Sequence, residues 1–155
     1  MDEGDDEVRA RASFNLGLMY FKGQGISQDK SKAEEYFKKV VVSKGNVQDK
    51  AESYYMLGII YSESSPDYSN YYKFGTLHGV FSTQDYSQAV EYFQKAADMG
   101  YAMAYFKLGG LYYYGWKGLP ANPKKAEECY DKACDMGIEE ACKIAEDIRR
   151  SNPCQ

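Results

Sequence analysis

The sequence predicts an all-α fold, a solenoid of stacked helix pairs, because two short patterns recur along it in alternation. The first pattern is a Leu-Gly pair with a Tyr four residues after the Leu, and the second is Ala-x-x-Tyr-Phe or a variant of it. The first pattern stands at Leu16, Leu57 and Leu108, and the second begins at Ala33, Ala89 and Ala126. Helix pairs of this length do not bury their apolar faces alone, so neighbouring pairs supply the core.

The first helix of each pair, helix A, is predicted from residues spaced four apart. Ala12, Leu16 and Tyr20 share one helix face at this spacing. Gly17 costs a helix about 1 kcal/mol relative to Ala, so we expect it to let a second helix approach closely. The stretch Gly23-Gln24-Gly25 ends this helix, because glycine adopts the positive φ that helix C-termini favour.

The second helix of each pair, helix B, is predicted from the residues that bound it. Asp29, Asp85 and Asn122 hold the same position ahead of the second pattern and are predicted N-caps. Gly100 and Gly137 follow the second and third helices B as predicted C-terminal stops.

The spacing between the patterns shows where the pairs are irregular. The step from helix A to helix B is 21 residues in the first pair (Ala12 to Ala33) but 36 in the second (Ser53 to Ala89). The second pair therefore contains an insertion, which lies within 62–82. The first pair is followed by a longer connection within 41–50. Insertions in repeat arrays map to loops, often on the binding face.

These patterns predict one domain over residues 1–155 that ends in a capping helix. The repeats are expected at about 10–45, 51–100 with the insertion at 62–82, and 102–137, with the cap at 138–150. In the cap, Ala145-Glu146 replaces the Leu-Gly pair. A polar terminal helix is what a solenoid needs in order to stop stacking.

Composition narrows the classes of partner. The chain has a formal net charge of −4 and 44% hydrophobic residues. An acidic balance argues against a nucleic-acid backbone or an anionic membrane surface as the main ligand, because both reward clustered Lys and Arg. No apolar run reaches the ~20 residues that a membrane span needs. We therefore expect no nucleic-acid partner and no membrane insertion.

The repeated motif resembles that of the Sel1-like repeat family, which is related to tetratricopeptide repeats. The residues Ala12 to Lys39 follow the family pattern nearly position for position, and Ser53 to Ala97 and Ala104 to Cys134 follow it around their insertions. The resemblance implies a right-handed α/α superhelix used as a protein-binding scaffold. The motif positions are structural, so they transfer no functional residue.

A narrower resemblance is to the cysteine-rich Sel1-like proteins of Helicobacter, some of which are described as penicillin-binding or β-lactamase-like. Those proteins carry a Cys pair eight residues apart in each repeat, and Cys134 and Cys142 reproduce this spacing once. In the preceding junction Ala97 and Tyr105 stand instead. The resemblance implies a Cys134–Cys142 disulfide if the protein is exported, whereas in a reducing compartment both would remain packed thiols.

Other candidate chemistry is weak in this sequence, and no cofactor or metal is predicted. Ser27-x-x-Lys30 fits the start of a penicillin-recognising motif but lies in a turn where polar residues are expected. His78 is the only histidine, so no site built from several histidines is available. Cys129 replaces a motif Tyr and is expected in the core, whereas Cys154 in the tail is a candidate free thiol.

The aromatic residues fall into two groups, one required by the motif and one not. The second group forms an additional stripe on the helices A and is a candidate peptide-binding groove, although packing between repeats would also account for it. Its members are Phe14, Leu18, Phe21, Tyr55, Ile59, Phe106 and Tyr113. The insertion adds Tyr68, Tyr71, Tyr72 and Phe74, which either fold back on the solenoid or grip a partner.

Two functions of different classes remain from the sequence. The first is a non-enzymatic scaffold that binds a protein or peptide segment on its helix-A face, and the alternative is an exported protein with penicillin-binding or β-lactamase-like activity. The acidic start of the chain lacks the features of a secretory signal, which favours the cytoplasm. Export is expected instead if Met1 replaces a leader, and a third interpretation is that the chain is a fragment of a longer solenoid.

Overall fold

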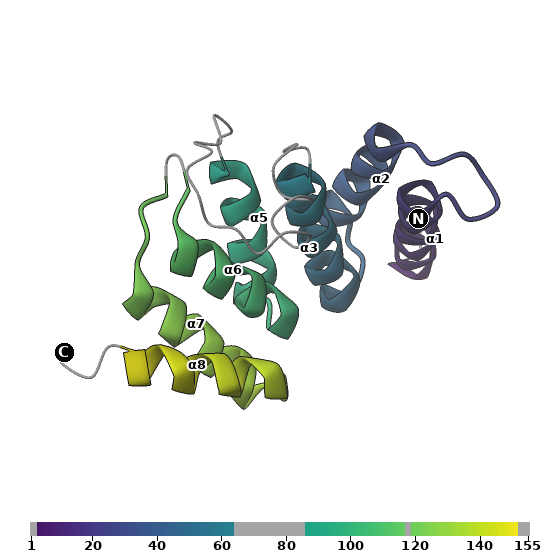
Figure 1. Cartoon of the computed structure of the whole chain (residues 1–155). Helices are drawn as coiled ribbons and strands as arrows, with labels where there is room; N and C mark the ends of the chain where they lie inside the picture. The colour runs from purple at the N-terminus through teal and green to yellow at the C-terminus, as the bar shows by residue number, and fades with distance from the viewer. Residues whose placement is uncertain (1–2, 64–85, 117–118, 152–155) are drawn as a thin grey trace.

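The computed structural model describes residues 3–63, 86–116 and 119–151 (Figure 1). Within these residues the regular structure is helical. The helices are α1 (Glu3–Lys22), α2 (Lys30–Val42), α3 (Val47–Glu63), α5 (Ser87–Asp98), α6 (Ala102–Tyr114), α7 (Pro123–Asp135) and α8 (Glu139–Ser151). Helices α1, α3 and α6 are the helices A, and α2, α5 and α7 are the helices B.

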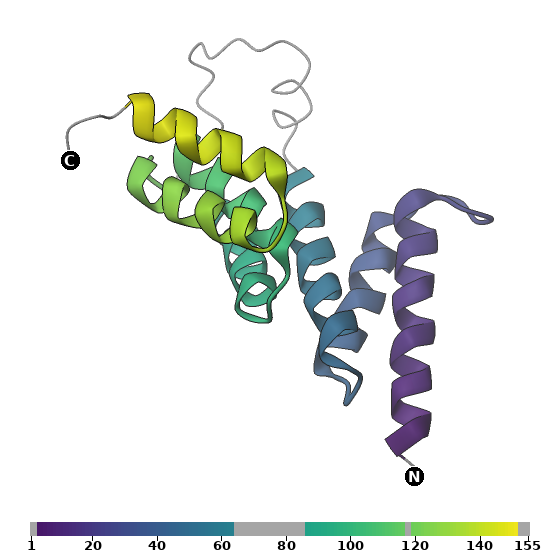
Figure 2. The same cartoon turned by 90° about the horizontal axis from the view of Figure 1, so that it is seen from below.

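The helices stack in chain order, so that each packs on the helices next to it in sequence. Figures 1 and 2 show this order as a continuous change of colour from α1 at one end to α8 at the other. Helix A packs on helix B within each pair, and α2 packs on α3, α5 on α6 and α7 on α8. The predicted all-α solenoid with a terminal capping helix is confirmed.

The glycine of each Leu-Gly pair accepts an aromatic ring from helix B of the same pair. A Cβ atom built on these glycines would lie 2.6–2.9 Å from a ring atom. The three contacts join Gly17 to Phe37, Gly58 to Phe93 and Gly109 to Tyr130. The predicted close approach at Gly17 is therefore confirmed, and its physical reason is the space that a ring needs.

Glycines also end the helices as the sequence predicts. Helix α1 ends at Lys22, and Gly23 and Gly25 follow with φ of 69° and 76°. Gly100 and Gly137, after α5 and α7, have φ of 85° and 99°. These values lie in the region that side chains with a Cβ rarely adopt.

The predicted N-caps hold at two of the three helices B. The side chain of Asp29 accepts a hydrogen bond from the Lys32 N–H at 3.0 Å, and Asn122 does the same for Lys125. Helix α5 differs, because it begins one position later in the repeat and its N-cap residue, Tyr86, makes no capping hydrogen bond through its side chain. The predicted cap Asp85 lies outside the described residues.

The longer connection after α2 ties α1 to α3. Asn46 caps α3 by accepting a hydrogen bond from the Asp49 N–H at 2.8 Å. The Asp49 side chain is 1% exposed, and its Oδ2 lies 2.9 Å from Arg11 Nε of α1 and 3.1 Å from Asn46 Nδ2. Gly45 lies against Ala10 of α1 so closely that an added Cβ would lie 2.6 Å from the Ala10 Cβ.

The three motif leucines are not buried alike. Leu57 and Leu108 are 0% exposed, whereas Leu16 of α1 is 36% exposed. Helix α2 covers Leu57 and helix α5 covers Leu108, but no helix of the described residues covers this side of α1. The position of a repeat in the array therefore decides what its motif leucine contacts.

Candidate functional site

The predicted groove residues divide into two rows, and the first row packs inside the helix pairs. Each of its rings faces the helix-B ring of its own pair, with centroids 5.5–5.9 Å apart. The contacts are Phe14 with Phe37, Tyr55 with Phe93, and Phe106 with Tyr130. Phe14 is 5% exposed and belongs to the core, so it is not available to line a groove. Tyr55 and Phe106 are half-buried.

The second row reaches the surface. Leu18 and Ile59 hold equivalent positions in α1 and α3, and both are half-buried. Phe21 and Tyr113 are likewise equivalent, the first half-buried and the second 39% exposed. These four residues keep the partial exposure that a binding surface requires.

Leu18 and Ile59 belong to a larger surface that the sequence reading did not recognise. On each helix A, the residues three or four positions away from Leu18, Ile59 or the equivalent residue of α6 lie on the same helix face as that residue. We call the resulting set the helix-A surface, and none of its members is buried. Its members are Arg11, Asn15, Leu18 and Lys22 of α1, Glu52, Met56, Ile59 and Glu63 of α3, and Met103, Lys107, Gly110 and Tyr114 of α6.

The helix-A surface mixes apolar and charged side chains. Met103 and Tyr114 are 38% exposed, and Met56 is half-buried. Methionine adapts its shape to a partner because its side chain is unbranched and polarizable. The spacing of these residues is present in the sequence. The predicted aromatic stripe instead includes neighbouring positions, such as Phe14 beside Asn15 and Phe21 beside Lys22.

The motif tyrosines fill the seam between neighbouring helices. Tyr61 of α3 donates a hydrogen bond to Glu34 Oε1 of α2 at 2.8 Å and packs on Tyr92 of α5 with ring centroids 5.3 Å apart. Lys38 Nζ lies 2.6 Å from the same Glu34 oxygen. The hydrogen bond to Glu34 raises the pKa of Tyr61. These contacts show that the motif tyrosine Tyr61 packs between helices.

The same cluster shifts the pKa of Glu34 in the opposite direction to that of Tyr61. Partial burial on its own would raise the pKa of Glu34, but the hydrogen bonds from Lys38 and Tyr61 outweigh it and lower that pKa. The carboxylate of Glu34 is therefore stabilised where α2 meets α3.

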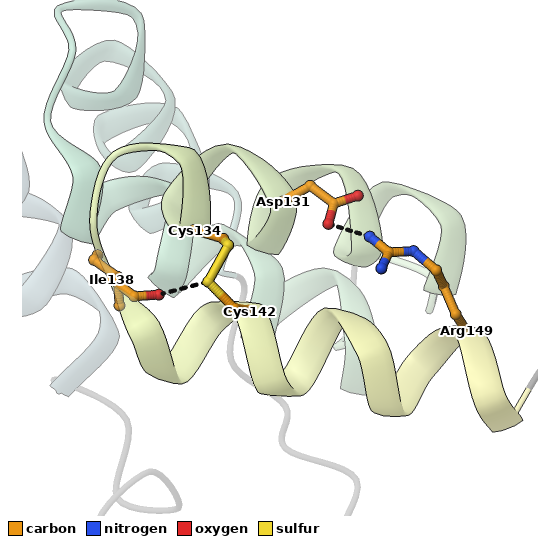
Figure 3. The surroundings of a disulfide bond; sticks show 5 residues. All are labelled: Asp131, Cys134, Ile138, Cys142 and Arg149. Atoms are coloured by element: carbon orange, nitrogen blue, oxygen red, sulfur yellow. Dashed lines mark hydrogen bonds and ion pairs between the residues drawn. A yellow bond between two sulfur atoms is a disulfide. The ribbon is translucent and has the colours of Figure 1, made fainter.

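Two cysteines join the last two helices. Cys134 of α7 and Cys142 of α8 form a disulfide with Cα atoms 4.8 Å apart (Figure 3). Farther along α8, Arg149 pairs with Asp131 and lies 2.6 Å from Glu127 Oε1, both on α7. The capping helix is thus attached by a covalent bond near its start and by ion pairs near its end.

Cys129 differs from this pair, because it is a free thiol. Burial raises the pKa of its thiol to about 11, so the group stays protonated at neutral pH. This environment agrees with the predicted packing role. Cys154, the other candidate thiol, lies outside the described residues.

The remaining sequence candidates form no cluster in the described residues. Ser27 is exposed ahead of α2, and Lys30 Nζ is engaged with Glu63 Oε2 of α3 at 3.0 Å. The described part of the chain contains no group of three His, Cys, Asp or Glu side chains suited to a metal ion. His78, Tyr68, Tyr71, Tyr72 and Phe74 lie outside the described residues.

The comparison with protein families agrees with this geometry. The model of the Sel1 repeat matches residues 10–39, 51–101 and 102–138, which is most of the chain. The chain belongs to the Sel1 repeat family. Among its described residues, no helix combines the length and the apolar character needed to cross a membrane.

Solved structures of Sel1-repeat proteins have the same fold. One is a protective antigen of uropathogenic Escherichia coli with an SLR fold, which matches at a TM-score of 0.70 and 21% identity over 92% of this chain. Another is a Sel1 repeat protein from Oxalobacter formigenes, at a TM-score of 0.65 and 27% identity over 89% of this chain. The matched region spans 26% and 47% of those two chains.

Proposed function

We propose that this Sel1-repeat chain is a non-enzymatic scaffold that binds a protein or peptide segment on its helix-A surface. Sel1 repeats typically mediate protein–protein interaction. The observation that carries the proposal is the row of partly exposed apolar residues at equivalent repeat positions, represented by Leu18 and Ile59.

The chemistry of the surface suggests what such a segment would contain. Apolar contacts would come from Leu18, Ile59 and the exposed side chain of Met103. Charges of both signs lie beside them, with Arg11 on α1 and Glu52 on α3. A segment with apolar anchors flanked by mixed charges would match this surface, because charged neighbours set register and specificity.

A matched pair of triple variants tests this function. The surface variant carries Leu18→Gln, Ile59→Gln and Met103→Gln. The control variant carries Val42→Gln, Val47→Gln and Met136→Gln, which replace exposed apolar residues away from the helix-A surface. Both would be used as bait in affinity capture from the source cells, with circular dichroism to check folding.

We expect the surface variant to lose a partner that the wild type and the control variant retain. Capture by all three baits would place the partner elsewhere and contradict the proposed surface. The penicillin-binding or β-lactamase-like alternative predicts turnover of nitrocefin by the purified chain. Turnover without any captured partner would overturn the scaffold function.

A further inference from the structure

The outer side of α1, opposite α2, is an apolar stripe in contact with solvent. Val8 is 69% exposed, Leu16 and Met19 are each 36% exposed, and Ala12 is exposed between them. These residues are three or four apart, so they share one face of the helix. We call them the outer face of α1.

The equivalent residues of the other helices A are buried by a preceding helix B. Leu57 and Ile60 of α3 are 0% and 4% exposed where α2 packs on it. Leu108 and Leu111 of α6 are 0% and 5% exposed where α5 packs on it. The outer face of α1 therefore continues an interface that is formed twice within this chain.

The other end of the solenoid shows that a second copy does not fit here by end-to-end stacking. The side of α8 that would receive the next helix B carries Lys143, Glu146, Asp147 and Arg150, all exposed. A charged face of this kind does not bury an apolar stripe. A helix of the helix-B kind supplied by a partner matches this face better than the charged end of a second copy does.

Polar contacts around the existing interfaces specify the chemistry of that helix. Glu34 of α2 accepts from the Tyr61 hydroxyl on α3, and the equivalent Glu127 of α7 pairs with Arg149, which stands at the same repeat position on α8. In α1 this position is Tyr20. Helices α2 and α7 thus place a glutamate at this point, whereas α5 carries Val90 there. The precedent for a tyrosine in the position of Tyr20 is the Glu34–Tyr61 contact.

A second contact involves a position whose charge is negative on α3 and positive on α1. Lys30, at the start of α2, pairs with Glu63 at the end of α3. The residue of α1 equivalent to Glu63 is Lys22. A helix that packs on α1 in the same orientation would therefore meet a positive charge where α2 meets a negative one.

We propose that the outer face of α1 docks a partner helix of the helix-B kind. This helix has a stripe of small apolar side chains, an acidic residue at its first position that reaches Lys22, and a glutamate four residues later that reaches Tyr20. The site is separate from the helix-A surface and does not depend on it.

A tethered helix tests this directly. A copy of residues 28–46 carrying Lys30→Glu would be joined ahead of Glu3 of the full chain by a flexible Gly/Ser linker, which keeps its effective concentration in the millimolar range. The copy also carries Phe37→Ala, because that ring packs at Gly17 within its own pair. NMR shifts of the Leu16 and Met19 methyl groups and the melting temperature would be measured.

We expect both methyl groups to shift and the melting temperature to rise by ~2–5 °C. Leu16→Glu in the tethered chain should abolish both effects. Val42→Glu in the chain's own α2, at an 83% exposed site off this face, should leave them intact. Restoring Lys30 in the copy should reduce the rise, because two lysines would then face each other.

Three results would overturn the proposal. The first is a tethered chain whose Leu16 and Met19 shifts equal those of the untethered chain. The second is a rise in melting temperature that survives Leu16→Glu. The third is a concentration-dependent shift of the same methyl groups in the untethered chain, which would assign the face to a second copy of α1.

Discussion

At one end of the solenoid α8 presents charged side chains to solvent, whereas at the other end α1 presents Leu16 and Met19. Both are helices of the helix-A kind, but α1 packs on the helix B that follows it, through Phe14 and Gly17. Helix α8 packs on the helix B that precedes it, through Ala145. Where α1 carries Phe14 and Gly17, α8 carries Lys143 and Glu146 at the equivalent positions. The exposed charged side chains of α8 and the exposed apolar side chains of α1 therefore lie on opposite faces of the repeat helix.

The attachments of the two ends differ as well. Helix α8 is held by the Cys134–Cys142 disulfide and by Arg149. Helix α1 is joined to α3 through Asp49 and the connection after α2. Beyond the packing of each end helix on its neighbour, one end is thus fixed by a covalent bond and ion pairs, and the other by a buried carboxylate. The following changes test this difference, in order of expected effect.

The largest effect is expected from a paired leucine truncation. Leu57→Ala removes a fully buried side chain and should lower the free energy of unfolding by about 2–5 kcal/mol. Leu16→Ala, at the same motif position, should lower it by less than about 1 kcal/mol because the side chain is already 36% exposed. Urea unfolding followed by circular dichroism measures both, and equal losses would contradict the difference between the ends.

Removing the disulfide should affect the α8 end. The double change Cys134→Ala and Cys142→Ala should cost about 2–3 kcal/mol, because the bond closes a short loop and limits the unfolded chain. Unfolding of the oxidised wild type should also become easier in dithiothreitol, by a similar amount. Hydrogen exchange in α1 should be unchanged, and faster exchange there would show that the two ends are coupled.

Removing the buried carboxylate should affect the α1 end. Asp49→Ala takes away the acceptor that Arg11 and Asn46 share, and it should cost about 1–3 kcal/mol. The expected signature is faster hydrogen exchange in α1 with little change in α8. Arg11→Ala is the milder control, since Arg11 is 56% exposed and its loss leaves Asn46 bonded to Asp49.

The smallest effect concerns pH at the α2–α3 contact. The pKa of Glu34 is lowered in the folded state, so its contribution is complete above the unfolded pKa of 4.5 and is lost as pH falls through the folded value. Because Glu34 is only partly buried and solvent screens its ion pair with Lys38, we expect less than about 1 kcal/mol. Urea unfolding of wild type and Glu34→Gln should diverge above pH 4.5 and converge in acid, whereas a constant gap would contradict this.

The sequence predicted most of the fold because the repeat motif carries its own physical reasons. Gly17 and Gly58 admit rings, and Asp29 caps a helix, through contacts within one pair. Such contacts are local enough for their spacing to reveal them. The exposure of Leu16 was not predictable in this way, because it depends on which helix lies beyond the motif.

The candidate site was predicted less well for a geometric reason. Phe14 and Leu18 are four residues apart and read as one stripe, yet Phe14 is buried against Phe37 while Leu18 reaches the surface. Hydrophobic spacing does not separate two adjacent rows on a helix when both are apolar. The burial of each row is set by the helix B of its own pair.

The most direct test of the difference between the ends is hydrogen–deuterium exchange of the oxidised full chain without a partner. Our account predicts that amides in the middle of α1 exchange faster than those in the middle of α8, because one side of α1 is uncovered and α8 is held by the disulfide and Arg149. Exchange in α1 that is as slow as in α8, or slower, would contradict it.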